Sequence, residues 1–344
     1  MKRSMILSIF ALTPWLFCGC PQTGSVESDT TDAGNASNAT QGSGNGGSST
    51  SGSGGGSTQT ESKTGIFIST PAGATGGLYD IYEGSGTTPV RQALDTNEIE
   101  EVDPGTYLLT RYFNTDFVYA VDVKVVAGAV TEVAFGALNV TTVADSDEAT
   151  FDIWDAAGAK VLTRAQSDNT ILPLPPGTYV IREYFNDVFS WAVNVQIVAG
   201  QVTTIPLGAF YLKSNEDWAN ANYDVYAADG ATLLSRPKGI NRQIPLPAGS
   251  FVMVDYFNDA FPFANVQVAA GAVTHFELGA ILYNGGESNY DIYDASGTKL
   301  LERPGSRGAP RGVPPGTYVL KDYFSDVVLA DGIEVSAGVV TEVQ

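Results

Sequence analysis

Residues 174–185 read Leu-Pro-Pro-Gly-Thr-Tyr-Val-Ile-Arg-Glu-Tyr-Phe, and this stretch decides the fold because part of it recurs along the chain. The recurring part is Pro-Gly-Thr-Tyr, with the variant Ala-Gly-Ser-Phe in one copy. The four copies lie at 104–107, 176–179, 248–251 and 315–318, and their glycines are 72, 72 and 67 residues apart. Self-similarity at a nearly constant spacing is typical of tandem structural repeats, so the chain is predicted to contain four copies of one unit.

Two further blocks recur in the same order within each unit. One is an aromatic-Asp-aliphatic-aromatic tetrapeptide, and the other is an Ala-Gly pair before a run rich in Val and Thr. The tetrapeptides lie at 79–82, 151–154, 223–226 and 290–293, and the pairs end at Gly128, Gly200, Gly271 and Gly338. These blocks place the four units at 63–137, 138–209, 210–280 and 281–344.

Each unit has the pattern of short β-strands separated by Gly, Pro, Asn and Asp. The strands predicted for the second unit are 138–143, 151–154, 160–163, 178–185, 191–198 and 202–207. A period of two puts Tyr179, Ile181, Glu183 and Phe185 on one face of a sheet, which is the predicted core face. Gly158 is predicted to supply the positive φ of a tight hairpin. The predicted fold class is all-β, with four small Ig-like sandwiches of six or seven strands each and no helix.

The composition excludes several classes of function. Asp and Glu total 38 against 18 Lys and Arg, which gives a formal charge of −20 over 344 residues. Such a polyanion repels phosphate backbones, so no nucleic-acid partner is expected. One histidine and two cysteines leave little material for metal sites, thiol nucleophiles or disulfides.

No unit carries an insertion that would build a catalytic pocket. The protein is therefore predicted not to be an enzyme and to need no metal or other cofactor. An unrecognised hydrolase stays open as a remote alternative, because a chain with 38 acids can always supply a pair of carboxylates.

The first residues have the features of an export signal. A positively charged start precedes an apolar run at 5–17 that is too short to span a bilayer as a helix. The run ends in Phe-Cys-Gly-Cys at 17–20, which resembles the lipobox of bacterial lipoproteins. The resemblance implies that 1–20 is a lipoprotein signal peptide and that Cys20 is lipidated. An ordinary cleaved secretory signal is the alternative.

Residues 21–62 form a predicted disordered linker. Gly, Ser and Thr make up 27 of these 42 residues, and the segment has no hydrophobic periodicity. Behind an acylated cysteine, such a linker would hold a folded body away from an outer membrane or cell surface. The first predicted partner is therefore the membrane, and the second is surface polysaccharide or another surface protein.

The Pro-Pro-Gly-Thr-Tyr turn, its strand and the later Val-Xaa-Ala-Gly-Xaa-Val-Thr run resemble the PEGA and carboxypeptidase-regulatory-like (transthyretin-like) sandwich families. The resemblance covers about 280 residues, as repeats. It implies non-catalytic modules for spacing, adhesion or display on a bacterial surface. The Tyr-Phe-Asn-Asp segment that follows the central strand departs from these families.

This Tyr-Phe-Asn-Asp segment is the candidate ligand site. Amide and carboxylate oxygens are typical Ca²⁺ ligands, and aromatic rings can stack on sugars. The alternative is a turn in which Asn and Asp bond their own backbone while Tyr and Phe close the end of the core. The candidate residues are Tyr112, Asn114, Asp116, Tyr184, Asn186, Asp187, Tyr256, Asn258, Asp259, Tyr323 and Asp326.

The remaining chemistry-bearing residues favour structural roles. Asp152 and Asp155 are three apart in a strand, and so lie on opposite faces, which disfavours a shared metal. Three tryptophans, Trp154, Trp191 and Trp218, would serve either as a sugar platform or in packing, and packing is favoured. The single histidine lies in a strand pattern and is predicted to face solvent.

The units are predicted to form a stiff row. Joints of the form apolar-Gly-Ala-apolar, at 135–138, 207–210 and 278–281, leave no loose linker between units. With strands of roughly 20–25 Å, four units predict a body about 100 Å long. The predicted function is a non-catalytic, lipid-anchored surface spacer or adhesion module. The first alternative is a carbohydrate- or calcium-binding module that uses the Tyr-Phe-Asn-Asp loops.

Overall fold

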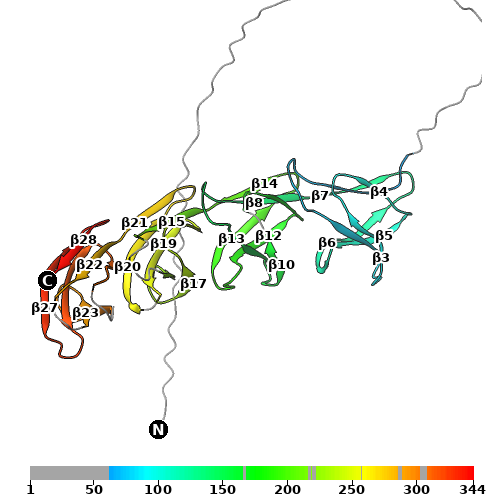
Figure 1. The fold of residues 1–344 in the computed structure, drawn as a ribbon. Coiled ribbons are helices and arrows are strands. Elements are labelled where there is room, and N and C mark those ends of the chain that lie inside the picture. The colour runs from blue at the N-terminus through cyan, green and yellow to red at the C-terminus, as the bar shows by residue number, and fades with distance from the viewer. Residues whose placement is uncertain are drawn as a thin grey trace, which may run out of the picture. The chain divides into compact units, whose positions relative to one another are not determined.

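The computed structural model describes residues 62–165, 168–215, 218, 222–256, 258–285, 289–302 and 308–344 (Figure 1). Its strands lie in one compact unit, Gln59–Gln344. The predicted signal peptide with Cys20, and residues 21–61 of the predicted linker, lie outside the described residues. The described part of the chain contains no helix that is long and apolar enough to cross a membrane.

The described residues form four groups of seven strands, here called repeats 1 to 4. Repeat 1 comprises β1 (Gly65–Ser69), β2 (Tyr79–Glu83), β3 (Pro89–Leu94), β4 (Ile99–Glu101), β5 (Gly105–Arg111), β6 (Asn114–Val125) and β7 (Val130–Ala134). Repeat 2 comprises β8 (Gly136–Thr141), β9 (Phe151–Asp155), β10 (Lys160–Ala165), β11 (Ile171–Leu174), β12 (Gly177–Glu183), β13 (Ser190–Ile197) and β14 (Val202–Pro206). Repeat 3 comprises β15 (Gly208–Lys213), β16 (Tyr223–Ala227), β17 (Leu233–Lys238), β18 (Gln243–Leu246), β19 (Gly249–Asp255), β20 (Asn258–Val268) and β21 (Val273–Glu277). Repeat 4 comprises β22 (Gly279–Tyr283), β23 (Tyr290–Tyr293), β24 (Leu300–Glu302), β25 (Arg311–Val313), β26 (Gly316–Asp322), β27 (Val328–Val335) and β28 (Val340–Val343).

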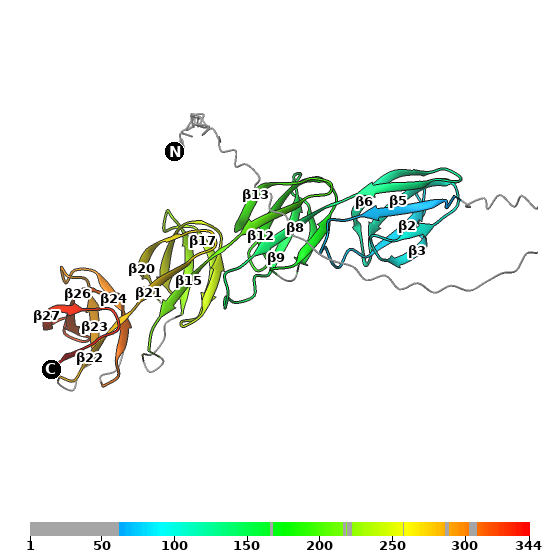
Figure 2. The same cartoon turned by 90° about the horizontal axis from the view of Figure 1, so that it is seen from above.

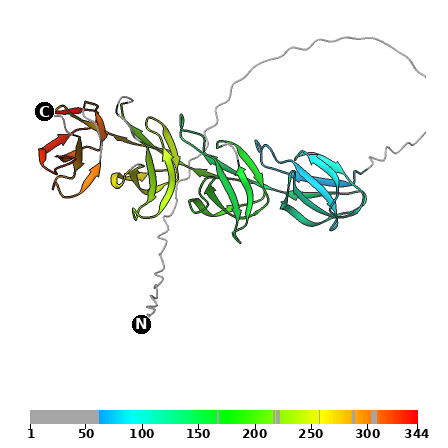
Figure 3. The ribbon, with the colours of Figure 1, turned by 60° about the horizontal axis from the view of Figure 1, so that its bottom comes forward.

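Each repeat is a sandwich of one four-stranded and one three-stranded sheet. In repeat 2 the larger sheet has the order β10-β9-β12-β13 and is antiparallel throughout. In the smaller sheet, β11-β8-β14, strand β8 is antiparallel to β11 and parallel to β14. The equivalent orders recur in every repeat. Figures 2 and 3 show the successive sandwiches from two further directions. The predicted all-β class and the four sandwiches are confirmed.

The strands of repeat 2 match the prediction except for β11, which the sequence did not reveal. Its residues include Pro173 and are followed by two more prolines, a pattern that indicates a turn. Strand β11 is an edge strand of the smaller sheet, and a proline is tolerated there because one side of an edge strand has no neighbour to receive its N–H. Gly158 has the predicted positive φ, 87°, in the β9–β10 hairpin.

The predicted core face of β12 is correct at its start and wrong at its end. Tyr179 and Ile181 are buried, and so is Glu183. Phe185 is 80% exposed, so its assignment to the core is wrong. Period two holds only while the chain is extended, and β12 ends at Glu183. Phe324 is equally exposed, at 79%, just beyond the end of β26 in repeat 4.

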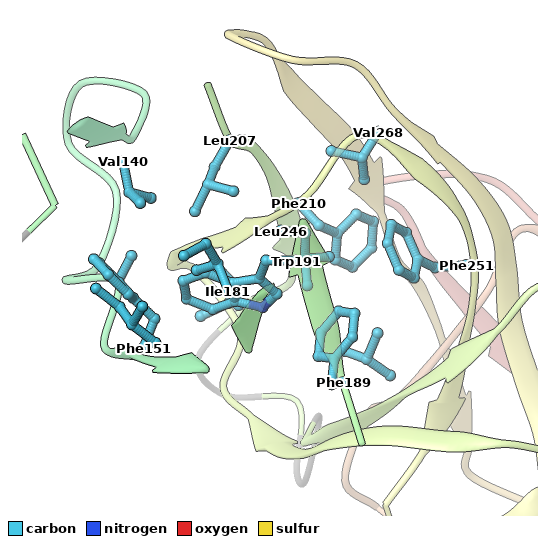
Figure 4. Packing of buried hydrophobic residues seen from close by; sticks show 14 of the residues in the cluster. Val140, Phe151, Ile181, Phe189, Trp191, Leu207, Phe210, Leu246, Phe251 and Val268 are labelled. Atoms are coloured by element: carbon cyan, nitrogen blue, oxygen red, sulfur yellow. The ribbon is translucent and has the colours of Figure 1, made fainter. Parts of the chain in front are cut away.

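The core is continuous from one repeat to the next. Buried hydrophobic residues of all four repeats belong to one contact cluster. Between repeats 2 and 3, Leu207 lies with Val140 of β8 on one side and Phe210 of β15 on the other (Figure 4). Strands β8, β15 and β22 begin at Gly136, Gly208 and Gly279, so the predicted limits at 137/138, 209/210 and 280/281 fall inside these strands.

A tyrosine hydroxyl closes the turn before the central strand of the larger sheet. Tyr179 Oη donates a hydrogen bond to the carbonyl of Pro175, at 2.9 Å. The equivalent bonds are Tyr107 to Asp103 at 2.7 Å and Tyr318 to Pro314 at 2.6 Å, whereas repeat 3 has Phe251 at this position. Burial raises the pKa of Tyr179 to about 12, because the phenolate would lose its hydration.

Alkaline pH is therefore expected to destabilise repeat 2. A group with a raised folded-state pKa stabilises the fold fully below its unfolded pKa, about 10 for tyrosine, and this contribution is lost as pH rises through the folded pKa. For Tyr179 the loss falls between pH values of about 10 and about 12. Tyr179→Phe should remove this part of the pH dependence and, at neutral pH, lower the stability of repeat 2 by about 1 kcal/mol. Circular dichroism during base titration and hydrogen exchange resolved by repeat measure the two effects. Identical hydrogen exchange of repeat 2 in the wild type and in Tyr179→Phe would contradict the role assigned to the Tyr179 hydroxyl.

Candidate functional site

The predicted ligand segments lie in the hairpins that connect the third and fourth strands of the larger sheets: β5–β6, β12–β13, β19–β20 and β26–β27. Each hairpin is separate in sequence from the others, and the four copies are not brought together into one site. Phe257 and the side chains of Asn258 and Asp259 lie outside the described residues.

The asparagine of this segment reaches the following repeat. Asn114 Nδ2, in repeat 1, donates to the carbonyl of Val161 in repeat 2, at 3.0 Å. Asn186 Nδ2, in repeat 2, donates to the carbonyl of Leu234 in repeat 3. The other end of the Asn186 amide, Oδ1, accepts from the backbone N–H of Val188 at 3.1 Å, as the turn interpretation predicts.

Repeat 4 differs at this position, where Ser325 replaces asparagine. Its hydroxyl donates to Asp322 Oδ1 at 2.8 Å, and the same oxygen accepts from the backbone N–H groups of Phe324 and Ser325 at 3.0 and 2.8 Å. In repeat 4 the side chain at this position thus bonds its own loop, whereas Asn114 and Asn186 bond the following repeat.

The predicted aspartate ligands have different partners. Asp116 is exposed, Asp187 Oδ1 lies 3.0 Å from Lys160 Nζ, and Asp326 accepts from Tyr293 Oη at 3.3 Å. Among the described residues, no group of three or more His, Cys, Asp or Glu side chains is arranged to hold a metal ion.

In the loops of repeats 1, 2 and 4, the phenylalanine of the aromatic pair lies outside the core. Phe113, Phe185 and Phe324 are 87%, 80% and 79% exposed, so the interpretation in which this residue closes the core is wrong. Each phenylalanine packs instead against the preceding tyrosine, Tyr112, Tyr184 or Tyr323, with ring centroids 3.7, 4.8 and 4.9 Å apart. An exposed phenylalanine packed against the preceding tyrosine is therefore a recurring surface feature of repeats 1, 2 and 4.

A buried residue joins each repeat to the next. The N–H of Leu207 donates to the carbonyl of Thr141 in repeat 2 at 2.8 Å, and its carbonyl accepts from Gly271 N in repeat 3 at 3.0 Å. Leu207 is 1% exposed, and a Cβ on the next residue, Gly208, would lie 2.2 Å from the carbonyl oxygen of Ala269. Phe135 and Leu278 make the equivalent pairs of bonds at the other two joints, to Ser69 and Gly200 and to Lys213 and Gly338. We call Phe135, Leu207 and Leu278 the joint residues.

The joint between repeats 2 and 3 has further polar contacts that the sequence did not reveal. Asp147 N donates to the carbonyl of Gln243 at 2.8 Å, and its carboxylate pairs with Arg242 at 2.8 Å. Ser235 Oγ donates to Glu183 Oε1 at 2.7 Å, and both residues are buried. This hydrogen bond from the next repeat explains why a buried acid is tolerated on the core side of β12.

The aspartate of the recurring tetrapeptide is buried in every repeat, which the sequence analysis missed. Asp80, Asp152, Asp224 and Asp291 are 3%, 0%, 0% and 1% exposed. Asp152 Oδ2 lies 2.6 Å from Lys160 Nζ, and this contact, with that to Asp187, raises the pKa of the Lys160 ammonium. Asp155 has a separate role, since its carboxylate accepts from Ala159 N at 2.8 Å in the hairpin. Asp152 and Asp155 thus have separate partners.

The tryptophans do not form a common platform. Trp191 and Trp218 are 8% and 5% exposed, in repeats 2 and 3, which confirms their predicted packing role. Trp154 is half-buried on the outer face of its sheet, with the Arg182 guanidinium 4.4 Å from its ring centroid. His275 is exposed in β21, as predicted.

No protein-family model matches the chain, and no curated protein matches it. Solved structures to which it is similar include the Bacillus anthracis TIE protein, at 14% identity over 78% of this chain and 68% of that chain, with a TM-score of 0.16. Another is BcpA, the major pilin subunit of Bacillus cereus, at 8% identity over 61% and 97% of the two chains, with a TM-score of 0.15. A third is SGBP-B of the Bacteroides ovatus mixed-linkage glucan utilization locus, in complex with a heptasaccharide, at 10% identity, 78% and 90% coverage and a TM-score of 0.09. TM-scores this low carry no argument about function, which rests on the joints and loops themselves.

The contact from Asn186 to repeat 3 predicts a measurable effect on the joint. Asn186→Ala removes the Nδ2 donor and should weaken the protection of β17 from hydrogen exchange by the equivalent of about 1 kcal/mol, the net value of one hydrogen bond. The matched control is Ser325→Ala, at the equivalent position of repeat 4, which should leave β17 unchanged. Equal protection of β17 in the wild type and in Asn186→Ala would show that this bond does not hold the joint.

Proposed function

We propose that the protein is a non-catalytic spacer that carries a surface activity away from a bacterial membrane to which it is anchored by lipid. The observation that carries the proposal is the pair of hydrogen bonds made by each joint residue. A residue bonded to the repeat before it and to the repeat after it restricts rotation between the two sandwiches. A spacer needs this property, because a chain of freely hinged domains does not hold its far end at a fixed distance.

The contacts around the joint residue support the same role. The apolar cluster runs through the joints, so bending a joint would expose buried hydrophobic area at about 25 cal/mol per Å². The Asn186 bond to Leu234 and the Arg242 pair with Asp147 add polar contacts on the same joint. Hydrogen bonds and ion pairs are directional, and they favour one orientation over its neighbours.

The anchor belongs to the proposal on the strength of the sequence. Cys20 follows a short apolar run and a small residue and precedes a linker rich in Gly, Ser and Thr. A lipid chain on Cys20 would fix the chain to an outer membrane or cell surface, and residues 21–62 would set the distance to repeat 1. Membership of the PEGA or transthyretin-like families is part of this proposal, supported by the motifs and by the sandwich topology.

The absence of catalysis is likewise proposed from the roles of the acids. Three of the buried carboxylates have structural partners: Asp152 contacts Lys160, Glu183 accepts from Ser235, and Asp322 accepts from its own loop. General acid–base catalysis needs a carboxylate that faces substrate, and these three hold strands or loops together.

The spacer function is tested by shortening the protein at an intact joint. Deletion of residues 208–278 joins Leu207 to Gly279 and so keeps a Leu-Gly joint of native type. A carboxy-terminal tag on cells should then lie closer to the membrane by about one repeat, roughly 20–25 Å, as measured by optical height profiling of a labelled antibody fragment. An unchanged height would contradict the spacer.

Two cysteine variants test the anchor in the same cells. Cys20→Ser should release the tag into the medium and abolish incorporation of a labelled fatty acid. Cys18→Ser is the matched control and should do neither, since only Cys20 directly follows a small residue. Retention of Cys20→Ser on the cells would refute lipid anchoring. The height measurement would still test the spacer function independently.

A further inference from the structure

A cavity of about 310 Å³ lies where repeats 2 and 3 meet. Its walls come from the β8–β9 loop, from β12 and the Tyr-Phe-Asn-Asp hairpin of repeat 2, and from β18 with the loop before it in repeat 3. Both repeats belong to the compact unit Gln59–Gln344 and are held together here by the Asp147 and Glu183 contacts. The cavity is at the lower end of the range of small-molecule sites, roughly 300–1,000 Å³.

One wall of the cavity is aromatic. Phe185 is 80% exposed and packs edge-on against Tyr184, with ring centroids 4.8 Å apart and an interplanar angle of 72°. Most of the phenylalanine ring is therefore uncovered. A ring in this position at the wall of a cavity offers a surface for the apolar face of a ligand.

A second wall contains the indole ring of Trp191, and only 8% of this residue is exposed. Its Nε1 has almost no accessible surface, so the indole supplies packing area to this wall and no donor to a ligand.

The remaining polar groups have complementary chemistry. Glu148 is exposed and offers carboxylate oxygens as acceptors, whereas Arg242 offers N–H donors beyond its pair with Asp147. The acids Asp147, Glu148 and Glu183 outnumber this one cation at the cavity, so an anionic ligand is disfavoured. The cavity thus combines an aromatic face, N–H donors and carboxylate acceptors under a negative potential.

We propose that this cavity binds one residue of a neutral saccharide. The C–H face of a pyranose would lie on the ring of Phe185, one hydroxyl oxygen would accept from an N–H of Arg242, and other hydroxyls would donate to Glu148. Sugars present such alternating apolar faces and hydroxyls, and a single pyranose suits a cavity of this size. The proposal adds a ligand to the protein and does not depend on the anchor or on the spacer.

Repeat 1 differs at these positions, which gives the experiment its control. In repeat 1, Arg111 and Tyr119 occupy the positions of Glu183 and Trp191, by strand register. Phe113 of repeat 1 is as exposed as Phe185 and lies outside the cavity of Phe185. Phe113→Ala therefore matches Phe185→Ala in chemistry and exposure but leaves the proposed site untouched.

The test is saturation-transfer NMR and calorimetry on the purified protein with free glucose, galactose, mannose and N-acetylglucosamine, and with glucuronic acid as the anionic comparison. At least one neutral sugar should bind, and glucuronic acid should bind more weakly. Phe185→Ala should weaken binding about tenfold or more, and Phe113→Ala should not change it. Glu148→Ala, which removes the exposed carboxylate acceptor, should also weaken it.

Three results would overturn the proposal: no binding of any of the four neutral sugars, binding that survives Phe185→Ala, or tighter binding of glucuronic acid than of every neutral sugar. Circular dichroism of each variant separates loss of the site from loss of the fold. Since Phe185 is exposed, Phe185→Ala should leave the spectrum unchanged.

Discussion

The residue that leaves one repeat and enters the next is hydrogen-bonded to both, and the architecture of the body depends on this constraint. The N–H of Leu207 bonds to repeat 2, and its carbonyl accepts from Gly271 in the turn between β20 and β21 of repeat 3. The next position has to be glycine, because a side chain on Gly208 would collide with the backbone of Ala269. The recurring Ala-Gly turn is explained in the same way, since the N–H of its glycine donates to the carbonyl of the joint residue.

Fixed joints make it possible for two repeats to share features that neither has alone. The apolar cluster continues through Leu207, the Asn186 amide bonds a strand of repeat 3, and Glu183 finds its hydroxyl partner on Ser235. The cavity beside Phe185 and Arg242 is of the same kind, because its walls come from both sandwiches. The shape of a cavity between two repeats is reproducible only where contacts hold the two repeats in one relative orientation.

The sequence predicts the elements well because their signals are local. Turn glycines, period-two alternation and the recurring blocks identify the all-β class, four sandwiches and most strands of repeat 2. It fails where the deciding contact is distant. Phe185 has the same hydrophobicity whether or not β12 continues to it, and the partner of Asn186 lies 48 residues away in another repeat. The candidate loops were identified as special, but their asparagine bonds a neighbouring repeat, and the cavity needs residues such as Arg242 that no motif marks.

The most direct test of the joints is a distance between two consecutive repeats in solution. Ala156 and Ala228 are exposed residues at equivalent positions of the β9–β10 and β16–β17 hairpins. A soluble form that begins after Cys20 contains no other cysteine, so Ala156→Cys with Ala228→Cys takes two spin labels. Pulsed electron spin resonance should give one narrow distance distribution, and adding Gly208→Ala should broaden it. A broad distribution in the protein with native Gly208, or equal widths in the two proteins, would contradict the account.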